Sequence, residues 1–141
     1  MKTIKLFSAA ILMAFSLNSF ANKEPEVNKL SMDYAVKTYI DAISSGKVKA
    51  FAEIVDKDAK FTITRGEKII NYSRSEMLGS MKHSENVVQN CNTDYMVVEQ
   101  TPSQAIVKVT MKYEAFSRIN YVTIAQTNTG WKITNVSTVF A

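Results

Sequence analysis

The feature that most constrains the fold is a strict alternation of side chains that begins near residue 105. One side of this stretch carries apolar and aromatic residues: Ala105, Val107, Val109, Met111 and Tyr113. The positions between them from 108 onward carry Lys108, Thr110, Lys112 and Glu114. Because successive side chains of a strand point to opposite faces, this stretch predicts a strand in a sheet with one apolar face. The other face is either solvated or covered by a partner.

The rest of the C-terminal half continues this period. From about Val87 onward the sequence predicts four strands and no helix, with turns at 101–103, 115–118 and 128–130. The last two strands form a hairpin over residues 121–140, in which the single tryptophan, Trp131, follows the turn. We expect its large ring to cover one end of the core.

The N-terminal half has helical periodicity instead. Ser31 is a suitable N-cap, and apolar residues then recur on one helical face at Val36, Tyr39, Ile40 and Ile43. Gly46 can end this helix in a left-handed conformation. A second short helix is predicted over residues 48–55 from the same spacing.

A hairpin and a third helix complete this half. Residues 59–72 are rich in β-branched and aromatic side chains around a turn at 65–67. Ser73 and Glu76 then match a capping box, and the helix that follows has Met77, Leu78 and Met81 on its apolar side. Helices followed by an antiparallel meander predict an α+β domain with three helices packed on the apolar face of the sheet.

The first residues have the features of a leader. Lys2 and Lys5 precede an apolar run from Leu6 to Leu17, and small residues follow at Ser19 and Ala21. This pattern predicts a signal peptide over residues 1–21, a flexible lead-in over 22–30 and one domain over 31–141. The run is shorter than the roughly 20 apolar residues that a transmembrane helix needs. The sequence therefore predicts export to the periplasm or the medium, without stable membrane insertion.

Composition excludes several kinds of function. The two leader lysines account for half of the formal net charge of +4, and no basic stripe with interleaved aromatics suggests nucleic acid. One histidine and one cysteine, without clustered acids, provide no metal site, and no glycine-rich phosphate loop is present. Cys91 is either a reactive thiol or a small buried hydrophobe. We expect no cofactor.

Two segments carry a family resemblance. "DYAVKTYIDAISSGKVKAFAEIVDKDAKFTI" (33–63) and "NYVTIAQTNTGWKITNVSTVF" (120–140) resemble the nuclear transport factor 2-like superfamily, closest to the bacterial putative lumazine-binding family and its SnoaL-like polyketide cyclase relatives. The resemblance implies a cone-shaped, curved antiparallel sheet, also known as a cystatin-like roll, with a pocket at its open end. It implies no single activity, because this fold carries enzymes, binding proteins and assembly modules.

The positions that match the catalytic carboxylates of the enzymatic relatives carry no acid in this sequence. Members similar to ketosteroid isomerases use a carboxylate base on the first strand and an acidic or tyrosyl oxyanion donor that faces it. The resemblance places Ile63 of this chain at the position of the base. Beyond residue 104 the only carboxylate is Glu114, which alternation turns away from the core. Asp94 is the one acid whose face alternation leaves open, and we expect it to face solvent. His83, the only histidine, is expected to end the third helix.

Five residues are candidates for lining a pocket: Tyr39, Tyr113, Asn120, Asn135 and Trp131. Each asparagine falls on an apolar row, where a buried amide must either bond to the backbone or bind a ligand. The resemblance implies an acidic residue at the Asn120 position, so this departure weakens any acid chemistry. The outer sheet face, which includes Thr134 and Thr138, would suit a homodimer or remain solvated.

These observations lead to two competing functions. The first is an exported, non-catalytic domain that binds a small apolar or aromatic ligand, or a partner. The alternative is a small isomerase, cyclase or dehydratase. The lack of a facing carboxylate pair favours the first.

Overall fold

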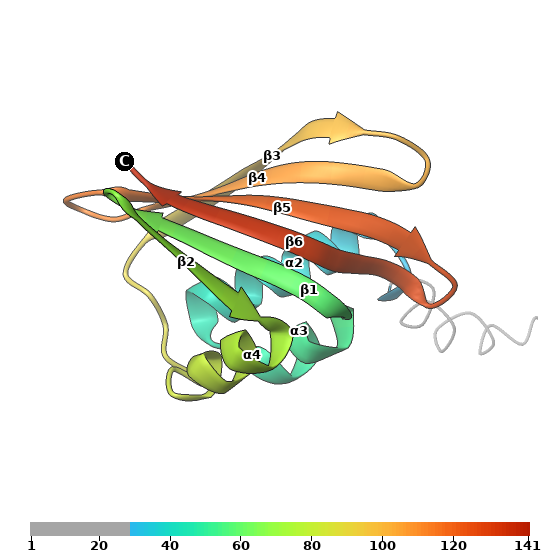
Figure 1. The fold of residues 1–141 in the computed structure, drawn as a ribbon, viewed down its shortest axis with the longest axis horizontal. Helices are drawn as coiled ribbons and strands as arrows, with labels where there is room; N and C mark the ends of the chain where they lie inside the picture. The colour runs from blue at the N-terminus through green and yellow to red at the C-terminus, as the bar shows by residue number, and fades with distance from the viewer. Residues whose placement is uncertain (1–28) are drawn as a thin grey trace, which may run out of the picture.

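Six strands form one curved sheet, and three helices lie together on one of its faces (Figure 1). This arrangement comes from a computed structural model, which describes residues 29–141. The predicted signal peptide and most of the predicted lead-in lie outside the described residues. The α+β class expected from the order of helices and strands is confirmed.

Local sequence signals explain where the helices begin and end. Helix α2, Met32–Ser45, begins at Ser31, whose Oγ accepts a hydrogen bond from the backbone N–H of Tyr34 at 3.1 Å. It ends at Gly46, which is left-handed with φ 69°. Helix α3 covers Val48–Ile54, and helix α4 covers Arg74–Lys82.

The capping box of α4 is present in full. Ser73 Oγ accepts from the Glu76 backbone N–H, and the Glu76 carboxylate accepts from the Ser73 backbone N–H at 2.7 Å. Helix α4 ends at Lys82 and His83 is its C-cap, as the sequence predicts.

The sheet order is β2-β1-β6-β5-β4-β3. The strands are β1 Val55–Arg65, β2 Lys68–Ser73, β3 Asn92–Gln100, β4 Gln104–Lys112, β5 Ser117–Thr127 and β6 Gly130–Phe140. The last four form the expected antiparallel meander, but β1 pairs with β6 in parallel, so the sheet is mixed. Alternation within a strand predicts its two faces and not the direction of a distant partner, which is why this pairing was not foreseen.

A β-bulge in β6 reverses two predicted orientations. Thr123 pairs with Asn135 while Ile124 pairs with Ile133, so Thr134 has no partner opposite it. The extra residue shifts the alternation by one. Asn135, expected on the core-facing row, is therefore exposed, and Thr138, expected on the outer face, is buried.

The core lies between the helices and the inner face of the sheet. Inward rows of β4 and β5 supply Val107, Val109, Val122 and Ile124, and α2 contributes one face from Ala35 to Ala42. Tyr113 was expected at the end of the inward row of β4, but it lies just after this strand and is half-buried. Among residues 29–141, no helix has the length and apolar character needed to cross a membrane.

Candidate functional site

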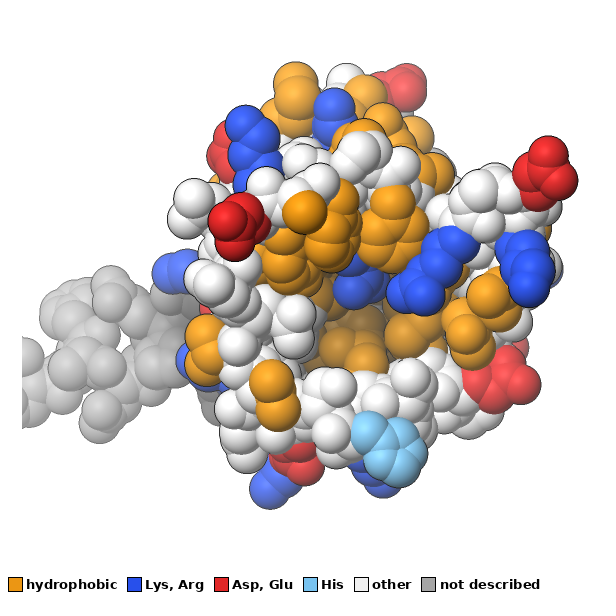
Figure 2. All heavy atoms as spheres, turned by 90° about the vertical axis from the view of Figure 1, so that its left-hand side faces the viewer, with side chains coloured by type: hydrophobic (Ala, Val, Ile, Leu, Met, Phe, Trp, Pro, Cys, Tyr) orange, Lys and Arg blue, Asp and Glu red, His pale blue; other side chains and the backbone are white. Residues whose placement is uncertain are grey.

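A cavity of about 300 Å³ lies between helices α2 and α4 and the inner faces of β1, β5 and β6. On the side of the molecule drawn in Figure 2, a hollow has hydrophobic side chains in its depth and Lys or Arg side chains at its edge. The volume is at the lower end of the range of about 300–1,000 Å³ that is typical of small-molecule sites.

The depth of the cavity is aromatic and aliphatic. The ring of Phe51 lies 5.9 Å from that of Tyr39 and 6.3 Å from that of Phe61, at tilted and edge-to-face angles. Ile63 of β1 and Met77 of α4 add aliphatic and thioether surface. Such a surface favours a flat or apolar molecule, because burial removes the apolar area of both partners from water.

The polar end of the cavity is organised by a buried amide. Asn120 is 0% exposed, and its Nδ2 donates to the carbonyl of Val109 at 3.4 Å. Its Oδ1 accepts from Thr138 Oγ1 at 2.8 Å and from Arg118 Nε at 3.1 Å. Asn120 therefore does not line the cavity itself but orients two residues that do, Arg118 and Thr138.

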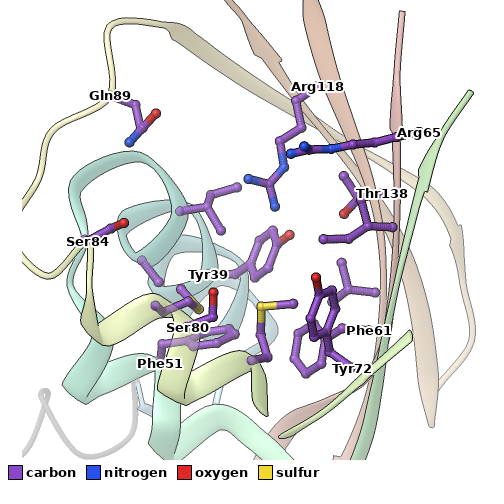
Figure 3. A pocket seen from close by; sticks show the side chains of 17 residues that line it. Tyr39, Phe51, Phe61, Arg65, Tyr72, Ser80, Ser84, Gln89, Arg118 and Thr138 are labelled. Atoms are coloured by element: carbon purple, nitrogen blue, oxygen red, sulfur yellow. The ribbon is translucent and has the colours of Figure 1, made fainter. Parts of the chain in front are cut away.

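Arg118 has an anchored guanidinium with two free ends. Only its Nε is hydrogen-bonded, and within residues 29–141 no acceptor binds its Nη groups. The side chain is half-buried and extends into the cavity in Figure 3. A guanidinium held in this way presents its remaining N–H donors in a fixed geometry.

A second arginine lies at the same end. Arg65, at the end of β1, packs its guanidinium over the ring of Phe140, with 5.1 Å between Cζ and the ring centroid. Figure 3 shows the Arg65 and Arg118 side chains converging above the cavity, away from Phe51. In the part of the chain that the structure describes, neither arginine forms an ion pair.

Tyr39 links the apolar and polar ends. It is 2% exposed, and its hydroxyl points into the cavity in Figure 3 without a hydrogen-bond partner among the described residues. Burial raises the pKa of Tyr39 well above its ordinary value, against a smaller lowering by the charge of Arg118. The phenol is therefore neutral at physiological pH and can act as a donor.

The other predicted pocket residues lie in different places. Tyr113 lies beside the cavity: its hydroxyl donates to Gln89 Oε1 at 3.2 Å, and Gln89 is part of the lining. Burial raises the pKa of Tyr113, with a smaller contribution from Cys91. Asn135 faces outward. Trp131 packs against the core at the start of β6, roughly 15 Å along the strand from the cavity residue Val136.

Sequence reasoning missed both arginines. It assigned them to turns, because Arg65 begins the predicted turn 65–67 and Arg118 ends the predicted turn 115–118. The alternation of side chains between the two faces of each strand could have identified them. Arg118 continues the inward row of Asn120 and Val122, and Arg65 continues the row of Phe61 and Ile63.

Carboxylates, imidazoles and thiols are absent from the lining that residues 29–141 provide. Within residues 29–141, no Asp, Glu, His or Cys lines the cavity, and Ile63 lines it at the position where the resemblance places a base. Asp94 is exposed on edge strand β3, Glu114 is exposed in a turn, and His83 is exposed after α4. No group of three or more potential metal ligands occurs in the described part of the chain.

Cys91 lies outside the cavity. It is a free, half-buried thiol whose Sγ is 3.8 Å from Thr93 Oγ1. It is thus less buried than a core hydrophobe.

Comparisons with known proteins agree with this architecture. A family model described as "Putative lumazine-binding" matches residues 29–140. No curated protein matches the chain in sequence. Several solved structures are similar in fold despite low sequence identity.

Three of these structures illustrate the likeness. A nuclear transport factor 2-like protein of unknown function from Silicibacter pomeroyi DSS-3 superposes with a TM-score of 0.66 at 15% identity, covering 77% of this chain and 92% of that one. A cystatin-like fold protein from Burkholderia xenovorans LB400 has a TM-score of 0.61 at 14% identity, covering 83% and 93%. A ketosteroid isomerase-like protein from Erwinia carotovora atroseptica has a TM-score of 0.59 at 16% identity, covering 79% and 95%. At these identities the likeness shows the fold alone.

Proposed function

The chain belongs to the putative lumazine-binding family of the nuclear transport factor 2-like superfamily, and on that premise we propose that it reversibly binds a small apolar or aromatic ligand without transforming it. One observation carries the proposal: the cavity combines three packed aromatic rings with no carboxylate, histidine or thiol in its described lining. Proton abstraction needs an unprotonated base within hydrogen-bond reach of the substrate, and burial keeps the phenol of Tyr39 protonated by raising its pKa. Binding needs only the shape and the apolar surface.

The alternative, a small isomerase, cyclase or dehydratase, has weaker support. Its main argument is the fold, which is shared with the ketosteroid isomerase-like protein from Erwinia. Asp94 is the acid that sequence analysis left open, and its exposure on edge strand β3 argues against a role in the cavity. Purified protein should therefore show no turnover of ketosteroid or polyketide-like substrates. Turnover that disappears in a folded Asp94→Asn variant would favour the alternative.

A paired substitution on helix α4 tests binding. Ser80 is exposed and lines the cavity, whereas Ser75 is exposed on the same helix outside the lining. With 2-naphthamide as a neutral aromatic probe, calorimetry should show binding to the wild type and to Ser75→Trp. Ser80→Trp should weaken it by about tenfold or more, since the indole occupies part of the cavity. Equal affinity in all three proteins would place the probe elsewhere and contradict the proposal.

We also propose that the protein is exported, which rests on the leader pattern of residues 1–21. A ligand-binding protein outside the cytoplasm would meet its ligand in the periplasm or the medium. The single cysteine agrees with this location, since the fold requires no disulfide.

A homodimer through the outer sheet face is part of the same proposal. One row across that face joins Met96, which is 58% exposed, to Lys108 and to Tyr121, which is 38% exposed. Burying these apolar side chains against a second copy would remove them from water. Light scattering should give the mass of a dimer for the wild type and of a monomer for a Met96→Glu, Tyr121→Glu double variant. A monomeric wild type would contradict this part.

A further inference from the structure

We propose that the ligand of this cavity is an amphipathic monocarboxylate, whose carboxylate binds Arg118 and whose apolar body lies on the aromatic floor. The inference rests on the proposed function and specifies the class of ligand. It depends on four observations: the anchoring of Arg118, the excess of positive charge, the free hydroxyl of Tyr39 and the separation of polar and apolar ends.

The anchoring of Arg118 leaves a docking geometry for a planar anion. Its Nε is already bonded to Asn120 Oδ1 at 3.1 Å, so the orientation of the guanidinium is set before any ligand arrives. Asn120 is in turn held by Val109 and Thr138. The two Nη groups then offer parallel N–H donors, which match the two oxygens of a carboxylate. Little side-chain entropy remains to be lost on binding.

The cavity has an uncompensated positive charge. Arg65 and Arg118 both line it, and no carboxylate of the described residues does. Arg65 is exposed at the rim and Arg118 is half-buried, so the charge of Arg118 is screened less by solvent. An anion bound beside Arg118 would compensate this charge. A neutral ligand would not.

Tyr39 supplies a further donor. Tyr39 as a residue is 2% exposed, its hydroxyl points into the cavity, and no hydrogen-bond partner of the hydroxyl lies within residues 29–141. Since no buried side-chain polar atom of the described residues lacks a partner, this hydroxyl is open to the cavity. Burial keeps the phenol protonated by raising its pKa, so it can donate to an anion and cannot itself supply a negative charge. A hydroxyl that opens into the cavity without a protein partner is available to donate a hydrogen bond to a bound ligand.

The two ends of the cavity define the shape of the ligand. The arginines lie at one end, and Phe51 and Phe61 lie at the other (Figure 3). A molecule that satisfies both has one anionic group and an aromatic or alkyl body. Arg65 is exposed and packs over Phe140. The donors directed into the cavity are therefore the fork of Arg118 and the phenol of Tyr39, which can satisfy the oxygens of a carboxylate. A phosphate dianion would also need Arg65, and a phosphate probe tests that outcome.

The experiment compares three probes that share one ring system: 2-naphthoate, 2-naphthamide and 2-naphthyl phosphate. By calorimetry, the wild type should bind the carboxylate about tenfold or more tightly than the amide, as expected for charge-assisted hydrogen bonds. Arg118→Gln should lose this preference, so that the ratio of the two affinities falls to about one, since the charge and the fork are removed together. Lys57→Gln, which removes one exposed cation outside the cavity, should keep the full preference.

A conservative variant guards against misfolding. Arg118→Lys keeps the charge but lacks the fork, so its preference should fall between those of the wild type and Arg118→Gln. Emission of Trp131, which lies away from the cavity, reports whether each variant is folded. If Arg118→Gln does not fold, the preference of Arg118→Lys for the carboxylate over the amide is used instead, and a reduced preference supports the assignment.

The outcomes separate the two proposals. If the wild type binds the amide as tightly as the carboxylate, the carboxylate inference fails and the proposed binding function stands. If neither probe binds, both fail. Tighter binding of the naphthyl phosphate, or an unchanged preference in a folded Arg118→Gln, would overturn the assignment of a carboxylate to Arg118.

Discussion

Asn120 shows how one buried side chain can organise a site that it does not line. Its amide connects three inner-face residues of the sheet: Val109 on β4, Arg118 on β5 and Thr138 on β6. A leucine of similar size would pack in the same space but would leave the Nε of Arg118 and the hydroxyl of Thr138 without their partner. The amide therefore stabilises the inner face and the orientation of the cavity's arginine together.

Two asparagines that looked equivalent in the sequence should differ in their effect on stability. Asn120→Ala should lower the free energy of unfolding by about 2–4 kcal/mol, because buried polar groups lose their partners. Asn135→Ala, at an exposed position, should change it by less than about 0.5 kcal/mol. Urea unfolding followed by Trp131 emission measures both. Similar losses in the two variants would show that Asn120 does not have this organising role.

Tyr39 should make stability depend on pH in the alkaline range. Its pKa is raised by burial, so the native state keeps a proton that the unfolded state releases above a pH of about 10. The stabilisation is complete below that pH and is lost as the pH rises further. The difference in unfolding free energy between wild type and Tyr39→Phe should be constant from pH 7 to pH 9 and should decrease above pH 10. A difference that stays flat at pH 11 would contradict the burial of a neutral phenol.

At the scale of elements, the end of α2 and the segment after α4 form one wall of the cavity. Gly46 O accepts from the backbone N–H of Asn86 at 3.0 Å, and Ser44 O accepts from that of Gln89 at 2.7 Å. These bonds hold residues 84–89 against the helix terminus. Ser84 and Gln89 reach the cavity through this contact, which joins segments about forty residues apart in the chain.

Two glycines offer a matched test of this contact. A Cβ at Gly46 would lie 2.5 Å from Ser84 O at a positive φ of 69°, so Gly46→Ala should destabilise the protein by more than about 1 kcal/mol and weaken probe binding. A Cβ at Gly79 of α4 would meet no atom within 4 Å. Gly79→Ala should therefore be neutral or stabilise by up to about 1 kcal/mol. Urea midpoints distinguish these outcomes, and a stable Gly46→Ala would show that residues 84–87 move easily.

At the scale of the whole molecule, the cavity lies between the helices and the sheet, and within residues 29–141 no helix covers the outer sheet face (Figure 1). Helix α2 contacts β6 and β4, and α4 contacts β1 and β2. Edge strand β3 is exposed along most of its length, including the apolar residues Tyr95 to Val98. Met96 of this strand belongs to the outer-face row that the proposed dimer would bury, whereas pairing through the strand edge would be a different contact.

The prediction of export concerns the chain together with its leader pattern at residues 1–21. When the protein is produced in a bacterial host, mass spectrometry of the envelope or medium fraction should find an N-terminus at or near Asn22, as expected from Ser19 and Ala21 before the cleavage site. Substituting arginine for Ile11 and Leu12, at the centre of the apolar run, should retain the protein in the cytoplasm. A cytoplasmic wild type that begins at Met1 would contradict export.

The sequence by itself determined the elements and the family. Capping at Ser31 and Ser73, the left-handed end at Gly46 and the period of β4 all depend on residues close in the chain, and each is confirmed. Such signals are local, so they can be read without knowing the partner of any strand. They also identified Tyr39 and Asn120 as residues of interest before any cavity was known.

Only the tertiary structure decided the parallel pairing of β1 with β6, the bulge at Thr134 and the meeting of Arg65 with Arg118. The two arginines come from strands more than fifty positions apart, and their proximity follows from sheet order rather than from any local pattern. The bulge reversed Asn135 and Thr138, because one extra residue turns every later side chain to the opposite face. The charge of the cavity therefore depends on long-range pairing, which no period within a single strand contains.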